Sequence, residues 1–353
     1  MNMLKDYKKE LKEIERIPVF FLKKHFWSII LTVIIIWIIF LKIDFQETAS
    51  YLAKVPTFFI LIAFLLNLAM YALWVFRWRL IIQKISKIRY FILFPIFFAG
   101  GLINQLTPGS KSGGQPLRAY YLNKINKKDF ADNFATTIFE FLSGSFVSLA
   151  LLVISLVYLF DSLSIELYYS IIALVVLSIL AVLSLIYLAY KLEKKSKFAL
   201  KILKLIYIIK PIKNRFKTFT AFEKNTLKEV REFFKETIIF LDDKPLLFKQ
   251  MLIELLTYLI EFFKVYILFK ALGIDAPFVL IAGVSVVSQM IGFLGFSPGG
   301  LGMVEGSAIG LFYLFGIDPE IAAAITILNR IILYFYEFVC GYISLLYLRQ
   351  KYQ

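Results

Sequence analysis

Long apolar runs separated by short charged segments dominate this chain. Several runs reach the roughly 20 residues that an α-helix needs to cross the hydrocarbon of a membrane. Sixty per cent of the residues are apolar, which agrees with this reading. The pattern predicts an all-α polytopic membrane protein with about six full crossings, at residues 26–43, 56–76, 135–160, 168–189, 249–271 and 320–347.

Two further apolar stretches are each broken by a glycine- and proline-containing loop, at Thr107–Gly114 and at Ser297–Gly302. Irregular backbone at membrane depth is tolerated only where protein buries it or where it lines a wet cavity. Paired interruptions in the two halves of a chain point to the binding site of a transporter. We expect each stretch to form a re-entrant hairpin. The expected gating positions in the two loops are Pro108, Gly109, Pro298 and Gly302.

Lysine and arginine gather beside the ends of the apolar runs, and they predict the topology. Positive charges flank the first interrupted stretch on both sides, so both flanks should be cytoplasmic. The flanks of the second stretch end near Asp275 and Asp318 without positive charge, so they should be external. Each half then has three crossings and one hairpin. The two halves form inverted-topology repeats, with both chain termini in the cytoplasm.

The same features divide the chain into four parts. Residues 1–25 are expected to form a cytoplasmic amphipathic segment, 26–190 the first membrane half and 249–353 the second. The connector 191–248 is strongly basic and also amphipathic, which predicts one or two helices on the cytoplasmic surface. A solvated connector and a specific lipid-binding surface both remain open for it.

Composition excludes several classes of site and of partner. A single cysteine, Cys340, and a single histidine, His25, exclude an internal disulfide and a cysteine- or histidine-based metal cluster. The net charge is +15, and the lysine and arginine side chains gather beside the expected helix ends. There they attract anionic lipid headgroups rather than nucleic acid. No phosphate-loop spacing is present, so no cofactor is expected. We find no side chains arranged for catalysis, and a membrane-embedded enzyme is the least expected class.

Each glycine-proline loop opens onto a new helical segment, which we expect to begin near Leu117 and near Met303. The unpaired N–H groups of a helix start suit a phosphate or a carboxylate. Glycines also let the backbone approach a ligand closely, although tight helix packing would explain them equally. The expected binding positions for a lipid phosphate are Arg118, Arg330, Gly113, Gly114, Gly299 and Gly300.

Buried charges supply the other candidates. Arg330 lies about ten residues into the last crossing, roughly 15 Å along a helix at the standard rise. A charge at such depth costs about 2.5–3.5 kcal/mol, which makes it a functional candidate. Glu305 is its expected partner, and a purely structural pair is the alternative. Glu305 and Glu140 would balance charge or accept the amine of a zwitterionic headgroup.

Three further predictions concern the crossing helices. Glu261 and Lys264 are spaced to pair within the fifth crossing. We expect Arg77 and Arg79 to extend to the membrane interface. Trp74 and Trp78 should anchor the interfacial aromatic belt rather than form a ligand cage.

The two loops carry a resemblance to a known family. The runs Leu106–Gly109 and Gly113–Tyr120 resemble the first signature of the lysylphosphatidylglycerol synthase transmembrane-region family, and Ser297–Gly306 resembles the second. This flippase-like family includes the membrane half of MprF proteins, and the resemblance covers essentially the whole chain. Arg330 falls where the family carries an arginine. Family members often place an arginine directly after an acid in the third crossing, whereas Phe141 follows Glu140 here.

The resemblance implies a flippase that moves an anionic phospholipid or a lipid-linked precursor between the leaflets of the cell membrane. Its partners would be membrane lipids and a separate lipid-modifying enzyme. MprF proteins append a synthase domain, but this chain ends at Gln353, so synthesis of a modified lipid is not expected. Two alternatives stay open. One is a secondary transporter of a small soluble anion, and the other is a non-transporting partner of a separate synthase or glycosyltransferase.

Overall fold

The computed structural model describes residues 43–107, 113–159, 218–294 and 297–352, with a few isolated positions between 165 and 176. The regular elements of these parts are all helical. The expected crossings at 26–43 and 168–189 lie almost wholly outside the described residues. So do two expected gating positions, Pro108 and Gly109.

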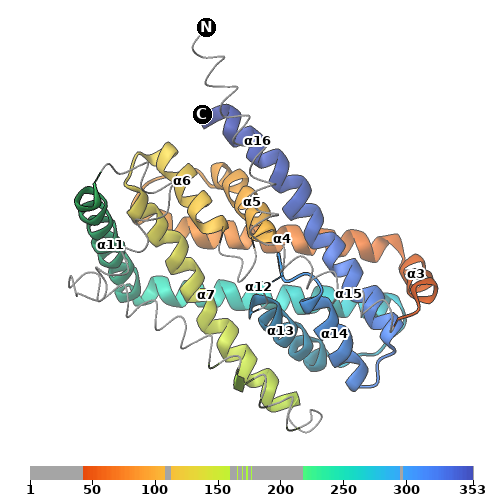
Figure 1. Cartoon of the computed structure of the whole chain (residues 1–353). Helices are drawn as coiled ribbons and strands as arrows, with labels where there is room; N and C mark the ends of the chain where they lie inside the picture. Colours follow the sequence, from red (N-terminus) through yellow and green to blue (C-terminus); the bar gives the residue numbers. More distant parts are fainter. Residues whose placement is uncertain are drawn as a thin grey trace.

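The described helices pack together as a bundle (Figure 1). In chain order they are α3 (Phe45–Lys54), α4 (Thr57–Ile82), α5 (Tyr90–Leu106), α6 (Gly114–Asn126), α7 (Phe130–Leu159), α11 (Phe219–Asp242), α12 (Lys244–Ala271), α13 (Phe278–Leu294), α14 (Met303–Leu314), α15 (Pro319–Tyr334), the π-helix η2 (Phe335–Cys340) and α16 (Gly341–Tyr352).

Aspartate caps define the starts of several helices. The carboxylate of Asp243 accepts the N–H of Leu246 at the start of α12. Asp318 does the same for two N–H groups of α15, where Pro319 follows as the first helical residue. Such caps satisfy N–H groups that have no partner within the helix, and proline is tolerated there because its missing N–H would be unpaired anyway.

Three helical segments in the described part are long and apolar enough to cross a membrane: α4, α7 and the continuous run Pro319–Tyr352. They match the crossings predicted at 56–76, 135–160 and 320–347. Helix α12 covers the predicted crossing at 249–271 but carries charged residues along its length. Large apolar side chains face outward, with Phe91 and Val157 80% and 69% exposed. The chain is therefore a helical membrane protein, and the total number of crossings stays a prediction.

The two interrupted stretches form helical hairpins, α5–α6 and α13–α14. Helices α5 and α6 approach so closely that a Cβ on Gly114 would clash with the carbonyl oxygen of Gly100. In the second hairpin a Cβ on Gly292 would clash with Val304. Helix α6 begins at Gly114, earlier than the predicted start near Leu117. Whether each hairpin enters and leaves the membrane on one side stays a prediction.

Helices α4 and α12 pack side by side and run antiparallel (Figure 1). Lys264 contacts Asn67, whereas Gln250 and Glu254 contact Arg77. Around this pair the two halves repeat one arrangement: α5 packs on α16, and α13 packs on α7. Antiparallel pairing of α4 with α12 is what inverted repeats require, and the inverted topology of the two halves in the membrane stays a prediction.

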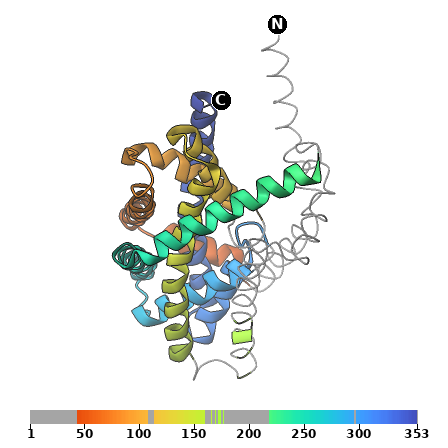
Figure 2. The same cartoon turned by 90° about the vertical axis from the view of Figure 1, so that its left-hand side faces the viewer.

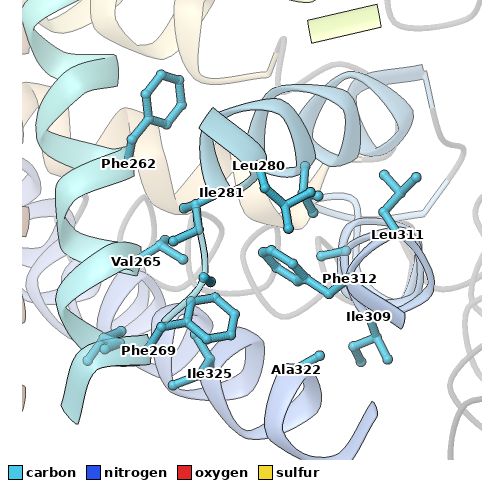
Figure 3. Close-up of a cluster of buried hydrophobic side chains, with 14 of the residues drawn as sticks. Phe262, Val265, Phe269, Leu280, Ile281, Ile309, Leu311, Phe312, Ala322 and Ile325 are labelled. Carbon is cyan, nitrogen blue, oxygen red and sulfur yellow. The ribbon is translucent and has the colours of Figure 1, made fainter. Parts of the chain in front are cut away.

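The second half has a continuous apolar core between α12, α13, α14 and α15 (Figure 3). Helix α11 lies obliquely across the bundle (Figure 2) and belongs to the connector predicted at 191–248. The Phe240 ring of α11 packs 5.5 Å from the Phe139 ring of α7. The core residues labelled in Figure 3 are Phe262, Val265, Phe269, Leu280, Ile281, Ile309, Leu311, Phe312, Ala322 and Ile325.

Candidate functional site

The first hairpin delivers Arg118 to a buried ion pair. Its guanidinium contacts the carboxylate of Glu140 on α7, and both side chains are 7% exposed. The guanidinium carbon also lies 4.0 Å from the centre of the Trp78 ring and 4.4 Å from that of Phe97. Gly100 leaves the room for this side chain, because a Cβ there would lie 2.8 Å from Arg118 Cγ.

This geometry supplies the basic partner that Glu140 lacks in its own sequence neighbourhood. Phe141 follows Glu140, and Arg118 provides the positive charge from another helix. The expected belt role of Trp78 is wrong. Its ring is fully buried, and its indole N–H donates to Thr136 Oγ1 over 3.1 Å. A buried indole N–H needs such an acceptor, and the ring face attracts the guanidinium.

The expected position of Arg77 at the membrane interface is also wrong. Arg77 is 3% exposed and points into the contact between α4, α7 and α12. Its Nε donates to Gln250 Oε1 over 3.1 Å, and the other nitrogens reach the Glu254 carboxylate and the carbonyl oxygen of Glu140. A buried charge needs such partners. Gly144 makes the site possible, since a Cβ there would lie 2.7 Å from Arg77 Nη2.

The second hairpin delivers Glu305 to the pair predicted from the sequence. Arg330 Nε lies 2.7 Å from Glu305 Oε1, as an ion pair whose N–H is not aligned for a hydrogen bond. Glu305 Oε2 accepts the N–H of Gly302, which fixes the carboxylate at the start of α14. Tyr334 OH lies 3.4 Å from Glu305, and its ring lies 5.6 Å from the Arg330 guanidinium.

A polar network next to this pair joins α4, α12 and α15. Lys264, 1% exposed, donates to Asn67 Oδ1 over 2.8 Å and pairs with Glu261 at 2.6 Å. The predicted Glu261–Lys264 pair is therefore confirmed. Asn329 Nδ2 donates to Glu261 over 3.0 Å, one residue before Arg330 on the same helix.

A constant offset of 187 residues relates three buried polar or charged positions of the first half to positions of the second. It takes Arg118 to Glu305, Asn67 to Glu254 and Arg77 to Lys264. The Arg77–Glu254 and Lys264–Asn67 contacts are therefore exchanged by the repeat. The hairpin residues Arg118 and Glu305 share this offset with opposite signs of charge, whereas their partners Glu140 and Arg330 stand 190 residues apart. Arginine stands on the hairpin in the first half and on the following long helix in the second.

The second loop meets the end of α5. Gln105, 2% exposed, donates through its amide nitrogen to the carboxylate of Glu337 in η2. Its amide oxygen packs against Gly299, where an added Cβ would clash. Gly299 has φ of 59°, which favours glycine. Single π-helical turns are frequent at functional sites.

The loop glycines predicted to bind phosphate have protein partners here. The Gly114 N–H donates to Asn104 Oδ1 over 2.7 Å, and the Gly300 N–H to the carbonyl oxygen of Ser297 over 3.2 Å. Gly113 packs against Thr107. Pro298 lies in the second loop, directly before Gly299 and Gly300. Their phosphate-binding and gating roles stay predictions.

The charged groups at these sites are two arginines with unpaired N–H groups rather than a cluster of metal ligands. Within the described ranges, no group of three or more His, Cys, Asp or Glu side chains is placed to hold a metal. Arg330 Nη2 is buried without a hydrogen-bond partner, and so is Arg118 Nε. Guanidinium N–H groups suit phosphate and carboxylate oxygens, so these unpaired donors favour an anionic ligand.

Comparison with known families agrees with the loop signatures. Residues 25–341 match the lysylphosphatidylglycerol synthase TM region. The chain belongs to this family. The matched range contains both hairpins, both ion pairs and the connecting helix α11.

The chain is similar to archaeal proteins described as UPF0104 membrane proteins. One from Methanothermobacter thermautotrophicus is 28% identical over 81% of this chain and 84% of its own length. One from Methanocaldococcus jannaschii is 24% identical over 83% of this chain and 85% of its own. One from Pyrococcus horikoshii is 24% identical over 92% of this chain and 97% of its own length. No solved structure matches the chain.

Proposed function

We propose that this protein moves an anionic phospholipid or a lipid-linked precursor between the leaflets of the cell membrane, in which both chain termini face the cytoplasm. The observation that carries the proposal is the pair of buried arginine–glutamate contacts, one on each hairpin, in a family named for its association with lipid synthesis. Burying charged side chains within a membrane is costly, so such residues are rare there and mark candidate functional sites.

Arg330 has unused capacity for an anion. Its contact with Glu305 uses Nε, whereas Nη2 is buried and has no hydrogen-bond partner. A headgroup phosphate would bind to this free edge of the guanidinium and compete with the carboxylate. Glu305 would keep its hydrogen bond from Gly302 and remain at the start of α14.

The first pair would act on the other side of the pathway. Arg118 is held against Trp78 and Phe97, so it stays in place when its carboxylate partner is exchanged for a phosphate. Glu140, once released, would accept the amine of a zwitterionic headgroup. Each hairpin would then serve as a gate, opened when lipid phosphate replaces the carboxylate of its ion pair.

The test uses a variant in which the second pair is neutral on both sides, Glu305→Gln with Arg330→Gln. Removing only Arg330 would leave a buried, uncompensated carboxylate and confuse folding with function. The matched control, Lys270→Gln with Asp275→Asn, removes an ion pair at the surface.

Each protein is reconstituted in liposomes, and the movement of a fluorescent anionic phospholipid between leaflets is followed by quenching. Lost charged hydrogen bonds of about 1.5–3 kcal/mol predict at least a tenfold slower rate for the buried variant and an unchanged rate for the control. A folded buried variant that moves lipid at the wild-type rate would refute the proposal. Movement of a soluble anion without lipid movement would favour the small-anion transporter.

A further inference from the structure

A cavity of about 510 Å³ opens at the end of the first hairpin that lies opposite its glycine-rich loop. It lies between the turn that joins α4 to α5 and the end of α6. Ser86, Lys87 and Arg89 line it from the turn, and Asn126 lines it from α6. The cavity belongs to neither ion pair described above.

The polar wall of this cavity is held in place by hydrogen bonds. Asn126 Nδ2 donates to Ser86 Oγ over 3.2 Å and to Asn133 Oδ1 over 2.7 Å. Asn133 is fully buried and donates back to Asn126 Oδ1 over 3.1 Å. The turn after α4 and the turn after α6 are thus joined, which fixes the width of the opening.

The charge of the cavity is positive. None of its lining residues is acidic, whereas Lys87 and Arg89 are both exposed and have no acidic partner in the described parts of the chain. The neighbouring Lys84 differs, because it pairs with Asp243 at 2.6 Å. Helix α5 begins directly after Arg89 without a side-chain cap, and its dipole adds to the positive potential.

The remaining wall is apolar, and the cavity lies at the end of a membrane span. Ile88, Ile92 and Ile125 complete its lining. The candidate span α4 ends at Ile82, shortly before the first lining residue, Ser86, so we expect the cavity to lie near the membrane surface. Two cations beside isoleucine side chains match the phosphate and the adjoining acyl chains of one lipid molecule. A free phosphate ion would leave the apolar wall without a contact.

We propose that this cavity is a specific binding site for the phosphate headgroup of an anionic membrane phospholipid, held by Lys87 and Arg89 with Ser86 and Asn126 as hydrogen-bond partners. Binding here requires neither transport nor the two buried ion pairs. The site would keep one anionic lipid beside the first hairpin.

The experiment reconstitutes the full chain in nanodiscs of phosphatidylcholine that contain a photoactivatable phosphatidylglycerol. Cross-linked peptides are mapped by mass spectrometry. The test variant is Lys87→Gln with Arg89→Gln. The matched control, Lys127→Gln with Lys128→Gln, removes two exposed charges just beyond the cavity.

Each basic side chain near an anionic lipid contributes about a factor of five. Cross-links around residues 83–92 should therefore fall about 25-fold in the test variant and persist in the control. An equal loss in both variants, an unchanged test variant, or equal cross-linking by photoactivatable phosphatidylcholine would each overturn the site. Displacement by excess inorganic phosphate would overturn the lipid as its occupant. The liposome assay of lipid movement is read separately, so failure of one proposal does not imply failure of the other.

Discussion

Arg118 and Glu305 stand 187 residues apart at equivalent places on the two hairpins, with opposite charges and oppositely charged partners. Each lies near the start of the helix that follows a glycine-rich loop, and each pairs with the next long helix of its half. Each hairpin thus contributes to a buried ion pair, but the two pairs have opposite polarity. One arginine lies on a hairpin and the other lies on a long helix.

The buried pair on the second hairpin makes a prediction about stability. Arg330→Gln alone leaves Glu305 without its cation, and a broken buried pair costs about 3–5 kcal/mol. Neutralising Glu305 as well should recover most of that loss, because two amides of similar volume remain. Thermal unfolding in detergent measures both effects. Equal melting temperatures for the single variant and the wild type would mean that the pair is not buried as described.

Arg77 should not tolerate replacement by lysine. The guanidinium reaches Gln250, Glu254 and the Glu140 carbonyl with three different nitrogens, a geometry that one ammonium cannot reproduce. We expect Arg77→Lys to lose about 1.5–3 kcal/mol of the free energy of unfolding, since a charge-assisted hydrogen bond is lost. If Arg77 extended to the membrane interface instead, its replacement by lysine would leave the free energy of unfolding unchanged. Chemical denaturation therefore distinguishes a buried Arg77 from an interfacial one.

Gly144 provides an independent check of the same contact. A Cβ there would lie 2.7 Å from Arg77 Nη2 and 3.1 Å from Glu254 Oε1, so Gly144→Ala should cost about 1–3 kcal/mol. Gly310→Ala is the matched control, because nothing lies within 4 Å of the added methyl group. The difference between the two melting temperatures is the measurement. A Gly144→Ala protein as stable as the control would contradict the packing of Arg77.

Some of these contacts could be predicted from the sequence, and others could not. Glu305–Arg330 followed from a carboxylate at a helix start and a charge deep in a crossing. Glu261–Lys264 followed from helical spacing. The side-chain partners of Arg77 lie 173 and 177 residues away, on α12, where no local pattern points to them. The 187-residue offset between Arg77 and Lys264 is the signal that would have found this site.

Gly299 tests the contact between the second loop and α5. Gly299→Ala places a methyl group against Gln105 and also strains a positive φ, whereas Gly316→Ala strains a φ of 79° with nothing within 4 Å. The strain costs about 1–2 kcal/mol in each variant. Only the first should also slow lipid movement in liposomes, because it separates the loop from α5. Equal rates in the two variants would remove this contact from the gating mechanism.

The Lys84–Asp243 pair predicts a pH dependence outside the membrane spans. A hydrogen bond from Lys84, with another from the Leu246 N–H, lowers the pKa of Asp243 below its usual 3.8. The folded chain therefore keeps this carboxylate ionised to a lower pH than the unfolded chain does. Its stabilising effect is complete above the unfolded pKa and is lost as the pH falls through the folded pKa.

Asp243→Asn retains the helix cap and removes the charge, so it isolates this effect. The variant should be about 0.5 kcal/mol less stable at neutral pH, as expected for a partly exposed ion pair, and the difference should shrink in acid. Denaturation curves at neutral and acidic pH measure it. A difference that stays constant with pH would contradict the assigned ion pair.

The most direct test of the central claim is native mass spectrometry of the lipids retained by gently purified protein. Protein with both ion pairs intact is compared with a variant in which Arg118, Glu140, Glu305 and Arg330 are all replaced by glutamine, after both have been shown to fold. Both proteins also carry Lys87→Gln and Arg89→Gln, which remove the separate lipid site proposed at the start of α5. The account predicts that a specific phosphate-bearing lipid is retained by the protein with intact ion pairs and lost from the variant. Identical bulk lipid in both samples would contradict the claim that the two ion pairs bind lipid.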